Sequence, residues 1–247
     1  MKKQFRNTKE IISRMSILAM LSALGFVLMA FAQFPYPFAP WLKIELSELV
    51  TIIAYALYGL PGGIAVAVIK TGLNLAVHGP VAMGIGDLTA LFTSLTIIFG
   101  LFLTSHIFKW FKKGIGFRIL AYSVITTIVV VILTSLNAIF ITPSYLSIFS
   151  MGRFSTCFED GVIQNVASYL TGNTKATYNA ASYLGVICAI YAPFNLMKMA
   201  MCLVAYEVLF NRLIFVFMRK SEFFQKYFVG DIFTKKIEEK PVEEKQA

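Results

Sequence analysis

Six apolar segments, separated by short polar or proline- and glycine-rich stretches, constrain this fold more than any other feature of the sequence. A transmembrane helix needs about 20 consecutive apolar residues, and these segments reach or approach that length. Charged residues make up only 14% of the chain, whereas soluble domains carry about 25%. The sequence therefore predicts an all-α integral membrane protein with six transmembrane helices. The predicted spans are 11–32, 46–60, 62–78, 88–111, 117–141 and 183–217.

Residues 1–218 are thus predicted to form one membrane domain, followed by a tail over 219–247. The tail is charged and lacks the apolar surface that a packed core needs, so we expect it to be disordered. Within the domain, the sequence "GLPGG" at 59–63 predicts a tight turn between the second and third spans.

Lysine and arginine cluster before the first span, between the fourth and fifth spans, and after the sixth span. Such clusters favour the cytoplasmic side of a bilayer. With six spans all three clusters fall on one side, so we expect both termini in the cytoplasm and the chain in the cell membrane. The clusters account for the net charge of +9 without nucleic-acid binding. They comprise Lys2, Lys3, Arg6, Lys9 and Arg14; Lys109, Lys112, Lys113 and Arg118; and Arg212, Arg219 and Lys220.

Three segments then lie on the outer side. The first, "FPYPFAPWLKIELSE" at 34–48, is stiff, aromatic and charged; the second is a short turn at 78–87. The third is a loop over 142–181. Loops of that length are usually functional or carry structure of their own. Within it, "GVIQNVASYL" at 161–170 predicts a short interfacial helix.

Ionisable and amide side chains inside the spans are costly in a bilayer, and they mark function more often than chance. A hydrogen bond between helices is the simplest role for an isolated amide, and a helix cap is the simplest role for Asp87. Lys70 and Glu207 are predicted to pair with each other. The full set is Lys70 and Asn74 in the third span, Asp87 at the outer end of the fourth, Asn137 in the fifth, and Asn195, Lys198 and Glu207 in the sixth.

The sequence "YAPFNLMKM" in the sixth span favours a ligand site. Pro193 removes a backbone donor from the helix and frees a carbonyl one turn earlier. Asn195 and Lys198, at positions i and i+3, share one helix face. A kink beside an amide and a cation on one face is suited to presenting polar groups to a ligand.

The first span carries small residues along one face, Ser16, Ala19, Ala23 and Ala30, with a small-xxx-small motif from Ala19 to Ala23. Such faces allow another helix to approach closely. The spacing leaves open whether that helix is internal or belongs to another protein.

No enzyme motif is present: the sequence contains no HExxH, GxSxG or Walker motif, and His78 and His106 lie on different spans. We expect no resident cofactor. Any energy from ATP has to come from another subunit.

The segment "FPYPFAPWLKIELSELV" closely resembles the first outer loop of the riboflavin-specific S component of energy-coupling-factor (ECF) vitamin transporters. "VIKTGLNLAVHG", "LTSLNAIFITPSY" and "APFNLMKMAMCLVAYEVLFNRL" match the family in the same order, over about residues 14–212. One departure is "GIGDLTALF", where the family has a Gly-Glu-Leu-Ala-Asn-Phe-like run.

The resemblance implies a six-helix membrane subunit that captures a vitamin from outside and works with a coupling transmembrane subunit and two ATPases. It implies that Ala19 and Ala23 contact the coupling subunit. It also implies a flavin pocket beneath the proline-rich segment, which would act as a lid. The predicted substrate-binding residues are Asn137, Asn195, Lys198, Asn74, Asp87, Trp41, Leu42 and Lys43.

Other functions stay open on the sequence alone. Within the same class, the substrate could be a flavin nucleotide or another vitamin, such as folate or pantothenate. Outside it, the chain could be an intramembrane enzyme acting on lipid, with Lys70, Asp87 and Glu207 as its acid–base groups, or an assembly subunit without a ligand.

Overall fold

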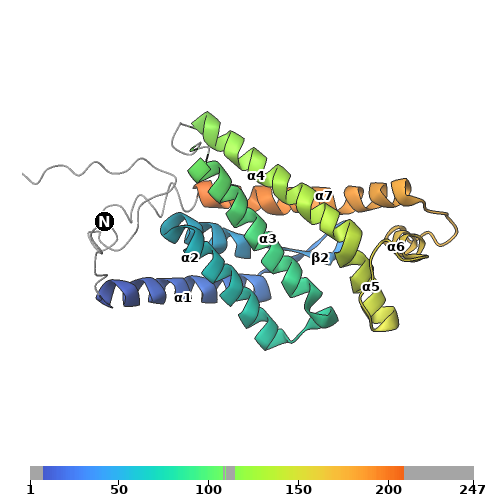
Figure 1. Cartoon of the computed structure of the whole chain (residues 1–247), viewed down its shortest axis with the longest axis horizontal. Coiled ribbons are helices and arrows are strands. Elements are labelled where there is room, and N and C mark those ends of the chain that lie inside the picture. Colours follow the sequence, from blue (N-terminus) through green and yellow to red (C-terminus); the bar gives the residue numbers. More distant parts are fainter. Residues whose placement is uncertain (1–7, 108, 110–114, 209–247) are drawn as a thin grey trace, which may run out of the picture.

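The structure, a computed structural model, describes residues 8–107, 109 and 115–208. Over these ranges the chain is mainly helical, with one two-stranded sheet (Figure 1). The elements in chain order are α1 (Thr8–Phe31), β1 (Gln33–Tyr36), β2 (Ala39–Glu45), α2 (Ser47–His78), η1 (Val81–Gly84), α3 (Ile85–Phe102), η2 (Leu103–Ile107), α4 (Ile115–Leu136), η4 (Asn137–Ile141), α5 (Thr142–Met151), α6 (Val162–Thr171) and α7 (Ala180–Ala205).

Five helical segments of the described chain are long and apolar enough to cross a membrane: Ile11–Phe31, Ser47–His78, Ile85–Ile107, Gly116–Ser150 and Ala180–Val208. These segments confirm the apolar helices predicted from the sequence. The count differs from six because the second and third predicted spans both lie in α2. The predicted continuation of the sixth span beyond residue 208, and the predicted tail at 219–247, lie outside the described residues.

A single glycine divides α2 into two helical arms. Gly59 has φ 70° and ψ −159°, a non-helical conformation inside the element, and this region of backbone space is essentially open to glycine alone. Pro61 follows within the first turn of the second arm, where its missing N–H costs little. The break coincides with the turn predicted from "GLPGG".

We expect Gly59→Ala to destabilise the protein by about 1–3 kcal/mol, because a Cβ is strained at this backbone conformation. Gly72→Ala, in the second arm of the same element, is the matched control. No atom lies within 4 Å of a Cβ placed there, and alanine is the better helix former. Thermal melting of the two variants should give a lower midpoint for Gly59→Ala only; equal midpoints would show that the break is not strained.

The proline-rich segment forms a β-hairpin, so the prediction of an all-α fold is wrong at this point. β1 and β2 pair antiparallel, with Gln33 opposite Glu45 and Pro35 opposite Lys43. Prolines resist helix formation but are tolerated in edge strands, and both strands of a two-stranded ribbon are edges. The Gln33 side chain also donates to the carbonyl of Met29, which ties the end of α1 to the hairpin.

The main core is built from α2, α3, α4 and α7. Its fully buried members include Tyr55, Ile97, Ile125 and Cys202, one from each of these helices. α1 packs on α2, where Leu18, Leu21 and Leu28 meet a separate cluster of buried α2 residues, and Leu21 also contacts the main core. Only 11% of the most apolar stretch of α1 is buried, against 50% for α2. One side of α1 is therefore open.

The predicted loop at 142–181 contains two helices, α5 and α6, at the end of the molecule away from the labelled N-terminus (Figure 1). α6 confirms the helix predicted from "GVIQNVASYL". Between them, the backbone N–H of Thr156 donates to the carboxylate of Glu159 and lowers its pKa, and Arg153 forms an ion pair with the same carboxylate. The segment is therefore ordered by its own contacts.

Candidate functional site

One face of α7 carries three polar side chains that point into the protein. Tyr191, Asn195 and Lys198 are spaced four and three residues apart, so they lie above one another on the helix. Their exposed fractions are 4%, 5% and 9%. α7 continues through Pro193 as one helix. The shared face predicted for Asn195 and Lys198 is confirmed, and Tyr191 extends it by one turn.

Asn137 meets the Tyr191 end of this face. The Thr142 hydroxyl donates to Tyr191 Oη at 2.8 Å and lies 3.3 Å from Asn137 Oδ1, while Asn137 Nδ2 donates to the carbonyl of Leu133 at 2.8 Å. Asn137 begins the π-helical turn η4, and π turns inside helices frequently occur at functional sites. The structure thus links Asn137 to α7 through Thr142 and Tyr191, while ligand contact by Asn137 stays a prediction.

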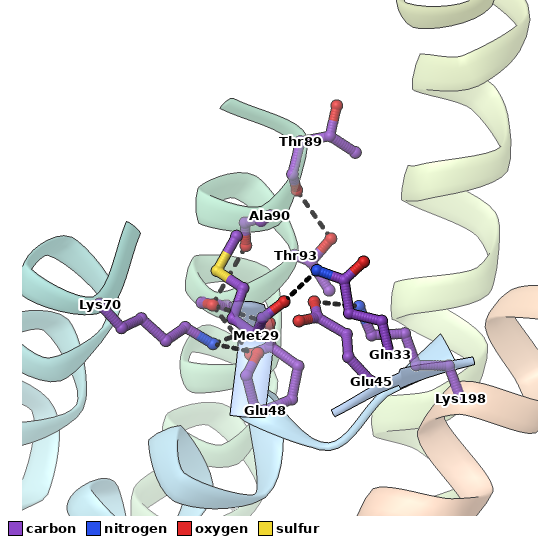
Figure 2. Close-up of polar contacts among 11 residues, drawn as sticks. Met29, Gln33, Glu45, Glu48, Lys70, Thr89, Ala90, Thr93 and Lys198 are labelled. Atoms are coloured by element: carbon purple, nitrogen blue, oxygen red, sulfur yellow. Dashed lines mark hydrogen bonds and ion pairs between the residues drawn. The ribbon is translucent and has the colours of Figure 1, made fainter. Parts of the chain in front are cut away.

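Glu45 meets the Lys198 end of the face. It is the last residue of β2, and its Oε1 accepts a hydrogen bond from Lys198 Nζ at 3.0 Å (Figure 2). Both side chains are almost entirely buried, so this pair is held away from water. The sequence prediction included the neighbouring residues Trp41, Leu42 and Lys43 of this segment but missed Glu45. The signal available was a carboxylate within "LKIELS", directly before the second span.

Two atoms of this arrangement lack hydrogen-bond partners within the described part of the chain. They are Asn195 Nδ2, a donor, and Glu45 Oε2, an acceptor. Most buried polar atoms in proteins are satisfied, and leaving one unpaired costs about 1–3 kcal/mol. An unpaired donor close to Lys198 in the sequence, and an unpaired acceptor on the residue that contacts it, can bind a ligand edge that alternates acceptors and donors.

Lys70 takes part in a second buried ion pair, with Glu48, so the predicted Lys70–Glu207 pair is wrong. Lys70 Nζ lies 3.0 Å from Glu48 Oε1. Glu207 pairs instead with Arg118, and it also accepts a hydrogen bond from Tyr122. The reason is the break at Gly59, which places the second arm of α2 beside the start of the first arm.

Asn74 and Asp87 contact each other. Asn74 Nδ2 donates to Asp87 Oδ1 at 2.7 Å and joins the second arm of α2 to the start of α3. This hydrogen bond between two helices is the simplest role predicted for the amide of Asn74. Asp87 lies in the first turn of α3, and the N-cap position of that helix is occupied by Gly84. Their role as ligand contacts stays a prediction.

The hairpin residues Trp41, Leu42 and Lys43 differ in burial. Leu42 is half-buried and packs against two apolar clusters, one of which contains Tyr191 and the other Phe194. Trp41 is 42% exposed and its ring lies 6.3 Å from that of Tyr169 in α6. Lys43 is exposed. Leu42 is therefore close to the α7 face, while ligand contact by Trp41 and Lys43 stays a prediction.

A separate hollow of about 420 Å³ lies between α4 and α7. Pro193 and Leu196 line it, but Asn195 and Lys198 do not, and its walls are almost wholly apolar. Because small-molecule sites need a few convergent polar groups, this hollow is not the candidate site.

Ala19 and Ala23 are both exposed on α1. They lie on the open side of that helix, among larger exposed residues such as Met15 and Met20. The described chain therefore does not use Ala19 and Ala23 for its own helix packing, and their contact with another protein stays a prediction.

Comparison with known proteins gives the family. Residues 13–210 match the family described as "ECF transporter, substrate-specific component". The chain belongs to this family. As an ECF substrate-specific component it is a multi-pass membrane protein that binds the substrate of a transporter, and it is not an enzyme.

Two curated relatives are similar to this ECF component. It is 32% identical to "Riboflavin transporter FmnP" of Bacillus subtilis (strain 168), over 54% of this chain and 69% of the relative. It is 26% identical to "Riboflavin transporter RibU" of Staphylococcus aureus (strain TCH60), over 81% and 89% respectively. A solved structure described as the S component of a bacterial ECF transporter has the same fold. It gives a TM-score of 0.55 at 21% identity and covers 83% of this chain and 97% of that one.

Proposed function

We propose that this ECF component binds riboflavin, captures it from the outer side of the membrane and delivers it to the other subunits of the transporter. The observation that carries the proposal is the buried polar face of α7, with the unpaired donor of Asn195 and the unpaired acceptor of Glu45 next to Lys198. The two curated relatives, both named riboflavin transporters, support the same substrate.

The chemistry of a flavin suits these groups. One edge of its ring is uracil-like, with a donor N–H between two carbonyl acceptors. Asn195 Nδ2 and Lys198 can donate to the carbonyls, and Glu45 Oε2 can accept from the N–H. The flat ring faces are apolar, and Leu42, Tyr36 and Phe194 form an apolar cluster between the hairpin and α7 that can cover them. Apolar walls with a few placed polar groups are the usual composition of small-molecule pockets.

The proposal includes six membrane crossings with both termini in the cytoplasm. The two arms of α2 on either side of Gly59 supply two of the crossings, and the lysine and arginine clusters favour this orientation. The hairpin then covers the outer mouth of the site as a lid. We further propose that a coupling transmembrane subunit binds α1 and that two ATPase subunits supply the energy.

The direct test is a titration of the detergent-purified chain with riboflavin. We expect saturable quenching of riboflavin fluorescence, because aromatic side chains would stack near the ring. Competition with the flavin nucleotide, folate and pantothenate controls for substrate class, and none should displace riboflavin at equal concentration. Absence of both quenching and calorimetric heat would reject a flavin as the substrate, and displacement by folate or pantothenate would reassign it.

A further inference from the structure

Two buried ion pairs lie next to each other at the base of the hairpin, and the proposed ligand site uses only one of them. Lys198 pairs with Glu45, and Lys70 pairs with Glu48, each at 3.0 Å. Glu45 ends β2 and Glu48 lies in the first turn of α2, three residues later. Figure 2 shows both pairs converging on this short link from opposite sides.

The two pairs are close enough to act as one cluster. Glu45 and Glu48 are three residues apart and both are buried, so the charge of Glu48 acts on Lys198, which is bound to Glu45, as well as on Lys70. Cys202, one turn after Lys198 on the same helix, is fully buried, so the surroundings of Lys198 are shielded from water. Two lysines and two glutamates make this cluster neutral. Removing one member of a buried pair leaves an uncompensated charge, and that is far more costly than removing both.

Lys70 is held firmly in this cluster. Its Nζ donates to Ser47 Oγ and Glu48 Oε1, both at 3.0 Å, and its side chain has no exposed surface. Its stem lies against α1, where a Cβ added at Gly25 would be 3.3 Å from Lys70 Cδ. Ser94 of α3 donates to the same carboxylate of Glu48. Glu48 is therefore compensated by Lys70 from the side away from the ligand site.

We propose that Lys70 is a positioning residue for the ligand site. By compensating the charge of Glu48, it keeps the Lys198 ammonium paired with Glu45, where it is available to the ligand. The proposal rests on the proposed function, since it assigns Lys70 a role in binding the same substrate. Without Lys70, the attraction of Glu48 draws the Lys198 ammonium away from Glu45. Lys70 then affects affinity without touching the ligand.

The decisive test is rescue by restoring charge balance. Lys70→Met should weaken riboflavin binding roughly tenfold, the size expected for coupled residues in one network. Lys70→Met combined with Glu48→Gln should return the dissociation constant to within about threefold of wild type, because the cluster is again neutral. Arg118→Met is the matched control: it breaks the Glu207 pair, which also involves α7, and should leave affinity unchanged.

Two results would overturn the proposal. If Lys70→Met binds riboflavin as wild type does, Lys70 is only structural. If the double variant binds no more tightly than Lys70→Met, charge balance is not the means by which Lys70 acts.

A ligand-free measurement tests the cluster with milder, isosteric changes. The melting temperature is measured for the single variants Glu45→Gln and Glu48→Gln and for the double variant. If the two pairs share one cluster, the carboxylate that remains in each single variant partly compensates both lysines. The double variant has no such carboxylate, so its melting temperature should fall by more than the sum of the two single decreases. Additive losses would show two independent pairs and overturn the proposal. This cycle gives its answer even if the wild-type chain binds no riboflavin, a result that would instead reject the proposed function.

Discussion

Asn195→Leu should weaken riboflavin binding by about 1–3 kcal/mol, or roughly five- to 150-fold, without lowering the melting temperature of the ligand-free protein. The amide nitrogen of Asn195 has no hydrogen-bond partner among the described residues. Leucine has a similar volume and removes this unsatisfied donor, so ligand-free stability should be unchanged or slightly higher. The ligand, by contrast, loses a donor in a site shielded from water.

Lys198→Met should weaken riboflavin binding at least as much as Asn195→Leu does, but it should also lower the stability of the ligand-free protein. Lys198 forms the buried pair with Glu45, so its loss strands a carboxylate, and breaking such a pair costs about 3–5 kcal/mol. The ligand-free melting temperature should therefore fall together with the affinity. Adding Glu45→Gln should recover part of the stability but not the affinity, since both ligand-binding groups are then altered.

Measuring the melting temperature and the riboflavin dissociation constant on the same samples separates binding from structural roles. Unchanged affinity in Asn195→Leu would remove that residue from the site. Unchanged affinity in Lys198→Met, with lower melting, would make the Lys198–Glu45 pair purely structural. Either outcome would leave the family assignment intact but move the ligand away from this face of α7.

The helices and the α7 face could be predicted because they depend on local sequence. Length of apolar segments alone locates the helical spans. The spacing of Asn195 and Lys198 places them on one helix face wherever that helix packs. The helix break at Gly59 could be predicted for the same reason, because a Gly-Leu-Pro-Gly-Gly run favours a break whatever surrounds it.

The partners of the buried charges could not be predicted, because they depend on which helices pack together. Lys70 and Glu207 each lie in an apolar span. An ion pair between them would offset the cost of burying each charge, so the sequence favoured that pair. The break at Gly59 brings Lys70 to Glu48 instead. Glu45 was missed for a related reason: its burial results from the hairpin lying over α7, a contact between segments about 150 residues apart along the chain.

The open side of α1 leads to the prediction with the largest effect. Ala19→Leu and Ala23→Leu should each leave riboflavin binding intact but abolish riboflavin uptake in cells that also carry the coupling and ATPase subunits. Both residues are exposed in this chain, so the added bulk meets no internal neighbour helix. Where small residues allow close approach of another helix, a leucine separates the two backbones and removes the contact.

A matched control is Ala76→Leu, at an exposed alanine in the second arm of α2. It adds the same side chain to an exposed position on another helix and should transport riboflavin as wild type does. Uptake of labelled riboflavin, compared with binding by the purified variants, separates the two steps. If Ala19→Leu and Ala23→Leu transport at wild-type rates, α1 faces only lipid on this side, and the coupling subunit binds elsewhere. If they lose binding as well as uptake, α1 instead supports the ligand site directly, through its packing on α2.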